Sequence, residues 1–140
     1  MNVQATSALM KKNIRSPDET RSFPNGKVEI LRLEDHTVAV VTLRPGWQWS
    51  RDVRRIEKTE NCLTEHLQYV ISGRLMVQMQ DGMRIELGPG DFASIPPRHD
   101  AWVVGDEPFL AIDFLGMEEY ARPREEADYG PEPDEVVGFD

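Results

Sequence analysis

The feature that most constrains this chain is a series of short apolar or alternating segments between residues 28 and 115, each ending in glycine, proline or acidic turn residues. Residues 28–33 and 37–43 are rich in β-branched side chains and flank the polar stretch Glu34-Asp35-His36. These segments predict two strands joined by a short turn. Many short strands with Gly and Pro corners are typical of β-sandwiches and closed β-barrels, so the sequence predicts an all-β fold.

A second hairpin is predicted further along the chain. Residues 75–79 and 85–87 flank Asp81-Gly82, a dipeptide that favours a tight hairpin turn. Helix is expected only as one short turn near the N-terminus, in Ser16-Pro17-Asp18-Glu19. There a serine can cap the turn, a proline suits the first helical position and a glutamate three residues after the serine completes a capping box.

Charge is distributed unevenly along the chain. The 140 residues carry a formal net charge of −9, and residues 118–140 hold nine acidic and two basic side chains, which contribute −7. Because this stretch also contains several prolines and glycines and little apolar surface, we expect it to be a flexible acidic tail. The acidic balance argues against nucleic acid or an anionic membrane as the main partner, since both require a basic footprint.

The single cysteine, Cys62, excludes an intramolecular disulfide. No apolar run approaches the ~20 residues of a membrane span. Residues 1–12 lack the order of basic and then apolar side chains that is typical of a signal peptide. We therefore expect a cytoplasmic protein with one folded domain.

Two stretches resemble the characteristic motifs of the cupin family. Residues 69–75, Tyr-Val-Ile-Ser-Gly-Arg-Leu, are similar to the strand that enters a glycine turn in the first motif. Residues 90–96, Gly-Asp-Phe-Ala-Ser-Ile-Pro, match the opening of the second motif. The resemblance, which extends to a bacterial group of stand-alone cupins, implies a small jelly-roll β-barrel over residues 25–117, preceded by an N-terminal segment, residues 1–24.

Cupins usually bind a divalent metal through three histidines and one glutamate inside the barrel, and this sequence departs from that set. Counted back from the motif glycine, the resemblance places His66 at the glutamate position, Cys62 at the second histidine position and Glu60 at the first. The remaining histidine position falls on Ala101, but His99 lies two residues earlier and would project to the same side of a strand. The resemblance thus implies that Glu60, Cys62, His66 and His99 form a rewritten metal site.

A carboxylate, a thiolate and two imidazoles suit a divalent metal, either Zn²⁺ or Fe²⁺. Each residue also has a purely structural explanation: Cys62 as a core thiol, His66 as a hydrogen-bonded core histidine, His99 as a rim residue and Glu60 as an exposed carboxylate. Cys62 and His66 could alternatively form a nucleophile–base pair, although no third, orienting residue is visible.

Four further side chains are expected at the ligand pocket. Gln68 lies on the same strand face as His66, and Asp113 lies in an apolar segment, where a buried carboxylate needs a partner. Trp49 and Trp102 would either line the mouth of a small-molecule pocket or plug the interior of a small barrel.

Two classes of function remain open from the sequence. The first is a metal-dependent enzyme of oxygenase, isomerase or lyase type that acts on a small organic molecule. The second is a non-catalytic small-molecule binder or sensor with a degenerate metal site, because function depends on the site and not on the fold. Leu67, Tyr69 and Ile71 lie on the strand face opposite His66, and an outer face of this kind must be covered by the N-terminal segment or a second subunit. The resemblance to cupins favours the second subunit, so we expect a homodimer.

Overall fold

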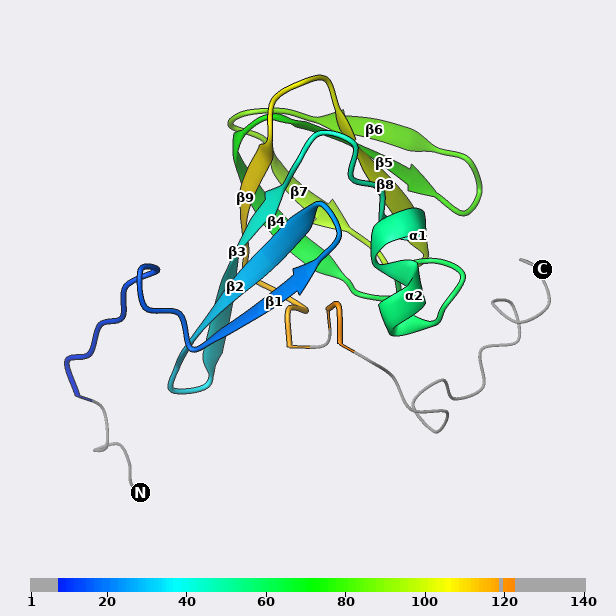
Figure 1. Ribbon diagram of the computed structural model, residues 1–140. Coiled ribbons are helices and arrows are strands. Elements are labelled where there is room, and N and C mark those ends of the chain that lie inside the picture. Colours follow the sequence, from blue (N-terminus) through cyan, green and yellow to red (C-terminus); the bar gives the residue numbers. More distant parts are fainter. Residues whose placement is uncertain (1–7, 119, 123–140) are drawn as a thin grey trace.

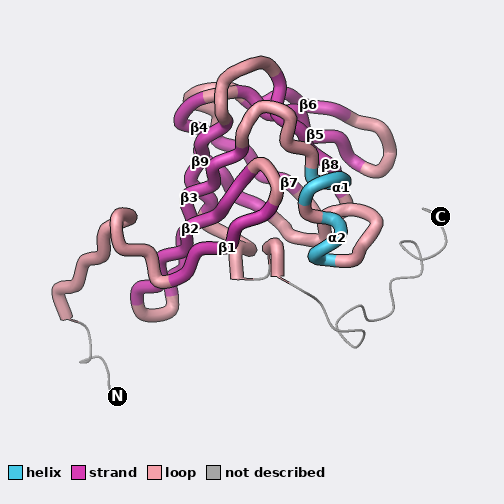
Figure 2. Tube along the Cα trace, in the orientation of Figure 1, coloured by secondary structure: helices cyan, strands magenta, loops and turns pink. Residues whose placement is uncertain are grey.

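A computed structural model describes residues 8–118 and 120–122, which form mainly β-strands (Figure 1). In chain order the elements are β1 (Glu19–Phe23), β2 (Gly26–Leu33), β3 (His36–Leu43), α1 (Trp49–Asp52), α2 (Arg54–Glu57), β4 (His66–Ser72), β5 (Arg74–Met79), β6 (Arg84–Leu87), β7 (Phe92–Ile95), β8 (His99–Val104) and β9 (Phe109–Asp113). Figure 2 shows how little of the path is helical.

The strands form two antiparallel sheets. One has six strands in the order β1-β2-β3-β9-β4-β7, and the other has three in the order β6-β5-β8. A closed barrel requires a ladder that returns to its first strand, and no ladder joins the two sheets within the described residues. The implied closed barrel was therefore wrong, and the all-β prediction was right: the two sheets face each other as an open sandwich.

Both predicted hairpins are confirmed. The strands β2 and β3 pair from Gly26–Leu43 to Leu33–His36, and β5 pairs with β6 beyond a turn at Asp81-Gly82. Gly82 has a φ of 95°, a left-handed conformation that glycine adopts without steric cost.

The helical turn predicted at residues 16–19 was wrong, because Glu19 already begins β1. Pairing with β2 competes successfully with the capping box. The backbone N–H of Asp18 donates to the carbonyl of Ile30 (2.9 Å), and the carboxylate of Asp18 accepts from the backbone N–H of Arg32 (2.7 Å) and from Lys12 Nζ (2.8 Å).

Two four-residue helices, α1 and α2, occupy the segment after β3, where no helix was predicted. Carboxylates satisfy the free N–H groups at the start of α1: Asp52 accepts from the backbone N–H of Gln48, and Asp100 accepts from that of Ser50, both at 3.0 Å. Asp100 belongs to β8, so this contact holds the helical segment against the three-stranded sheet. In the described part of the chain, no helix is long and apolar enough to span a membrane.

The core lies between the two sheets. Strand residues alternate between buried and less buried positions, as in the pattern of β8, and the buried apolar set includes Val41, Leu43, Val70, Leu75, Val77, Ile95, Phe109 and Ala111. The outer face of the six-stranded sheet is also apolar. Cross-strand pairing forms the row Val40–Ile112–Tyr69–Phe92, in which Tyr69 is 43% and Phe92 64% exposed.

The chain turns back onto the sandwich after β9. Gly116 has a φ of 86°, and a Cβ there would lie 2.3 Å from the carbonyl oxygen of Glu65, so only glycine fits. The next described residues include Met117, Tyr120 and Ala121, all of them buried. The start of the expected flexible tail is therefore packed, while residues 119 and 123–140 of that tail lie outside the described residues.

Candidate metal centre

His66 is the first residue of β4 and points into the space between the sheets with 4% of its surface exposed. Its Nδ1 lies 2.7 Å from Oδ2 of Asp113, a fully buried carboxylate on the neighbouring strand β9. Because a carboxylate accepts and cannot donate, Nδ1 carries the hydrogen. Nε2, the other ring nitrogen, then faces Cys62, with Sγ 3.8 Å away.

The buried carboxylate of Asp113 is compensated by three donors. Besides His66, Gln68 Nε2 donates to Oδ2 (2.8 Å) and the backbone N–H of Leu115 donates to Oδ1 (2.9 Å). Gln68 and Asp113 are directly opposite each other in the β4–β9 register. The sheet therefore fixes the carboxylate that orients His66. Histidine ligands at metal sites commonly donate a hydrogen bond to such a carboxylate.

His99 approaches from the other sheet, at the start of β8. Its Nδ1 donates to the carbonyl of Pro96 (2.7 Å), which leaves Nε2 free to accept. Burial, together with the nearby His66, lowers the pKa of His99 to about 3, so the ring is neutral at pH 7 and has a lone pair to offer. The two imidazole rings meet edge to face, with centroids 5.2 Å apart.

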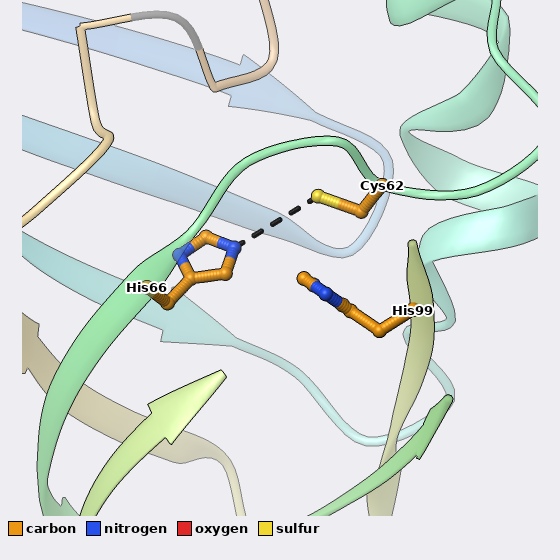
Figure 3. A group of neighbouring side chains, drawn as sticks. All are labelled: Cys62, His66 and His99. Carbon is orange, nitrogen blue, oxygen red and sulfur yellow. Dashed lines mark hydrogen bonds between the residues drawn. The ribbon is translucent and has the colours of Figure 1, made fainter. Parts of the chain in front are cut away.

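Cys62 is held beside His99 by the backbone. Its N–H donates to the carbonyl of His99 (2.8 Å), and its own carbonyl accepts from the N–H groups of Arg98 (2.7 Å) and His99 (3.3 Å). One ligand atom from each of Cys62, His66 and His99 lies within 4.8 Å of the other two, and all three side chains are buried. Figure 3 shows the sulfur and the two rings converging on one space.

This donor set fits a divalent transition metal. Zinc–sulfur bonds of about 2.3 Å and zinc–nitrogen bonds of about 2.0 Å place sulfur and nitrogen about 3.5 Å apart in a tetrahedral site. The Cys62–His66 separation of 3.8 Å is close to that value. Both histidines have Nδ1 bound to an acceptor and Nε2 directed inward, which is the tautomer that metal ligation requires.

The space beside the cluster is small. The cavity has a volume of about 20 Å³, enough for roughly one water molecule, and its lining includes His66, His99 and Gln68. Trp49 also lines it.

Two of the residues singled out from the sequence lie elsewhere. Glu60 is ion-paired with the guanidinium of Arg54 and is not part of the three-residue cluster. Trp102 faces outward from β8 and lines a separate groove of about 540 Å³, with the guanidinium of Arg84 5.2 Å from its ring centroid.

Tyr120 is the site residue that sequence reasoning missed. Its ring is 4% exposed, lines the cavity and meets the His66 ring edge to face at 5.5 Å. Burial raises its pKa well above the usual value, and the nearby Cys62 and Glu57 act in the same direction, so the phenol stays neutral. Its position inside an acidic stretch hid it, although Tyr120-Ala121 is an apolar pair within that stretch.

Comparison with known proteins agrees with the fold. A family profile described as "Cupin domain" matches residues 63–115. That match covers β4 to β9, which carry His66, His99 and Asp113. This part of the chain therefore carries a cupin domain. No curated protein matches the sequence of this cupin.

Solved structures of similar fold share little sequence with this cupin. KdgF from Halomonas sp. is 17% identical, with 87% of this chain and 99% of that chain covered and a TM-score of 0.54. A protein of unknown function from Rhizobium leguminosarum is 20% identical, with coverages of 84% and 100% and a TM-score of 0.54. A cupin-like protein from Thermotoga maritima is 19% identical, with coverages of 84% and 95% and a TM-score of 0.50. At these identities the likeness concerns the fold alone.

Proposed function

We propose that this cupin binds one zinc or iron ion through Cys62 Sγ, His66 Nε2 and His99 Nε2. We also propose that it is a metal-dependent enzyme that acts on a small organic molecule. The observation that carries the proposal is the convergence of these three buried donors from both sheets. Glu60, the fourth ligand that the family resemblance implied, is occupied by Arg54 and is left out of the proposed set.

Hydrogen bonds determine which ring nitrogen of each histidine is available to bind an ion. Asp113 holds the hydrogen of His66 on Nδ1, and the Pro96 carbonyl does the same for His99. Binding of an ion requires the thiolate form of Cys62, so metal uptake should release protons. A bound ion would supply Lewis-acid chemistry, by polarising an oxygen atom or activating a water.

Metal analysis tests the proposal directly. Protein purified without a tag and incubated with zinc or with iron under anaerobic conditions should hold close to one ion per chain after desalting. The variants Cys62→Ser and His66→Gln should hold at least tenfold less. His36→Gln is the matched control, because His36 lies in a turn with 79% of its side chain exposed.

Cobalt substitution adds a spectroscopic check, since a thiolate ligand gives a charge-transfer absorption that Cys62→Ser should abolish. Wild-type protein that folds normally and stays metal-free in both incubations would contradict the proposal.

A second candidate function rests on the groove at Trp102. This hollow of about 540 Å³ has the size of a small-molecule site, and Gln48, Gln78 and Asp100 give it polar walls. A non-catalytic binder would place its ligand there and keep the buried cluster as a structural centre. A thermal-shift screen of small polar compounds would favour this function if hits vanish in Trp102→Ala but persist in Cys62→Ser.

We further propose that the cupin forms a homodimer through the outer face of the six-stranded sheet. The row of apolar side chains across β3, β9, β4 and β7 supports this arrangement, because a two-fold axis can place such a self-complementary patch against its own copy.

A further inference from the structure

The cavity beside the cluster is lined by side chains from both sheets and by side chains that lie outside the strands. Four of its lining side chains lie outside the strands: Trp47 and Trp49 on one segment, and Met117 and Tyr120 on another. A two-sheet sandwich is open at its ends, so these four side chains are what close the cavity.

Among these four side chains, Tyr120 is the one whose ring contacts a member of the cluster, His66, edge to face. Its ring centroid lies 5.5 Å from that of His66, at an interplanar angle of 71°, and 6.0 Å from that of Phe23 on β1. The side chain therefore lies between the proposed metal ligand His66 and Phe23 of β1.

Two anchors hold the backbone around Tyr120. Arg21 Nη1 donates to the carbonyl of Tyr120 (2.7 Å) and to that of Met117 (3.0 Å). The fully buried carboxylate of Glu57 accepts from the backbone N–H of Ala121 (2.5 Å). These contacts come from β1 and α2, which are distant in sequence, and a packed side chain needs such support to keep its position.

We propose that Tyr120 closes the entrance to the cavity beside the Cys62–His66–His99 cluster, and that Arg21 acts as its positioning residue. With the ring in place the cavity of about 20 Å³ admits a species the size of a water molecule. Any larger reactant reaches the cluster only when Tyr120 moves aside. The inference deepens the proposed function, on which its relevance to catalysis rests, by making Tyr120 the residue that determines substrate size.

Because Cys62 is the single cysteine of the chain, a thiol reagent reports on this residue alone. Cys62 Sγ lies 3.8 Å from Nε2 of His66, which lines the cavity, so the reaction rate of the thiol in metal-free protein reports whether the entrance is open. The rate is measured with a bulky aromatic disulfide reagent and with the smaller iodoacetamide. Tyr120→Ala should accelerate both reactions at least tenfold, whereas Tyr120→Phe, which keeps the ring, should restore the slow rate of the wild type.

Three variants separate closure from other effects. Arg21→Gln leaves the cavity lining intact and should give a rate between those of the wild type and Tyr120→Ala. Trp49→Ala removes another side chain of the cavity lining that lies outside the strands. Leu87→Ala removes a core side chain that does not line the cavity and controls for general destabilisation.

Acceleration in Trp49→Ala or Leu87→Ala equal to that in Tyr120→Ala would overturn the proposal. Unchanged rates in both Tyr120→Ala and Arg21→Gln would also overturn it, and Arg21→Gln decides the matter if Tyr120→Ala does not fold. Since all measurements use metal-free protein, a failure of metal binding leaves this result independent.

Discussion

At the scale of single residues, the candidate site depends on partners that do not touch the ion position. His66 and His99 each have one ring nitrogen bound to an acceptor, and Cys62 is fixed through its backbone. Such support determines which ring atoms face inward, and it contributes to metal affinity without adding a ligand.

Asp113→Asn tests this support. An amide can present its nitrogen to His66, which would favour the wrong tautomer, so zinc affinity should fall by about 10- to 100-fold. The measurement is competition with a chelator of known affinity. Asp81→Asn, in an exposed hairpin turn, should leave zinc affinity unchanged. Equal affinities for Asp113→Asn and wild type would show that the carboxylate does not orient the ligand.

Gly116→Ala tests the turn that returns the chain to the site. Both Gly116 and Gly82 have a positive φ, but a Cβ at Gly82 would meet nothing within 4 Å. Gly82→Ala should therefore cost only the backbone strain, about 1 kcal/mol, whereas Gly116→Ala also forces a clash with the Glu65 carbonyl and should cost at least about 2 kcal/mol. Urea unfolding of both variants measures the difference, and equal losses would contradict this account.

At the scale of elements, an ionic network ties β1 and β2 to the segment after β9. Arg32 Nη2 pairs with Glu19 (2.7 Å) and Arg32 Nε pairs with Glu118 (2.8 Å), and Thr37 Oγ1 donates to the same Glu118 oxygen (2.9 Å). Hydrogen bonds lower the pKa of each carboxyl to about 2, with Arg21 the largest cause for Glu19 and Arg32 for Glu118.

The network predicts a pH dependence of stability. Because the folded pKa of Glu118 lies below its ordinary value of 4.5, its contribution is complete above about pH 4.5 and is lost as the pH falls towards 2. Glu118→Gln should reduce the free energy of unfolding by at most about 1 kcal/mol at pH 7, since the pair is partly exposed. Urea unfolding from pH 7 to pH 3 should show the gap between variant and wild type narrowing below pH 4.5. A gap that stays constant would contradict the assignment.

Elements specified by local sequence could be predicted, whereas contacts across the fold could not. Asp81-Gly82 determines its hairpin within a few residues. The turn at residues 16–19 failed because Asp18 bonds to β2 instead, a contact that no local pattern contains. Sequence reasoning selected Cys62, His66 and His99, but no local pattern shows that the backbone of Cys62 pairs with that of His99.

At the scale of the whole molecule, the apolar outer face is the feature that the isolated chain leaves unexplained. Tyr69 and Ile71 are each 43% exposed, and Phe92 is 64% exposed, all in one sheet. Exposed apolar surface of this kind is typical of an interface.

The homodimer proposal predicts the effect of a charge on this face. Tyr69→Lys should convert a dimer of about 32 kDa, twice the 16.0 kDa of one chain, into monomer, as measured by light scattering after size exclusion. Leu9→Lys, at a fully exposed position before β1, serves as the control and should leave the mass unchanged. A monomeric wild type at micromolar concentration would contradict the proposal.

The cluster also has a mechanical meaning for the sandwich. His66 belongs to the six-stranded sheet and His99 to the three-stranded sheet, and no ladder joins these sheets in the described part of the chain. An ion bound by both histidines would cross-link two sheets that are otherwise held together by apolar packing. Metal binding would then slow the separation of the two sheets, so the unfolding rate would be lower for the metal-bound protein than for the metal-free protein.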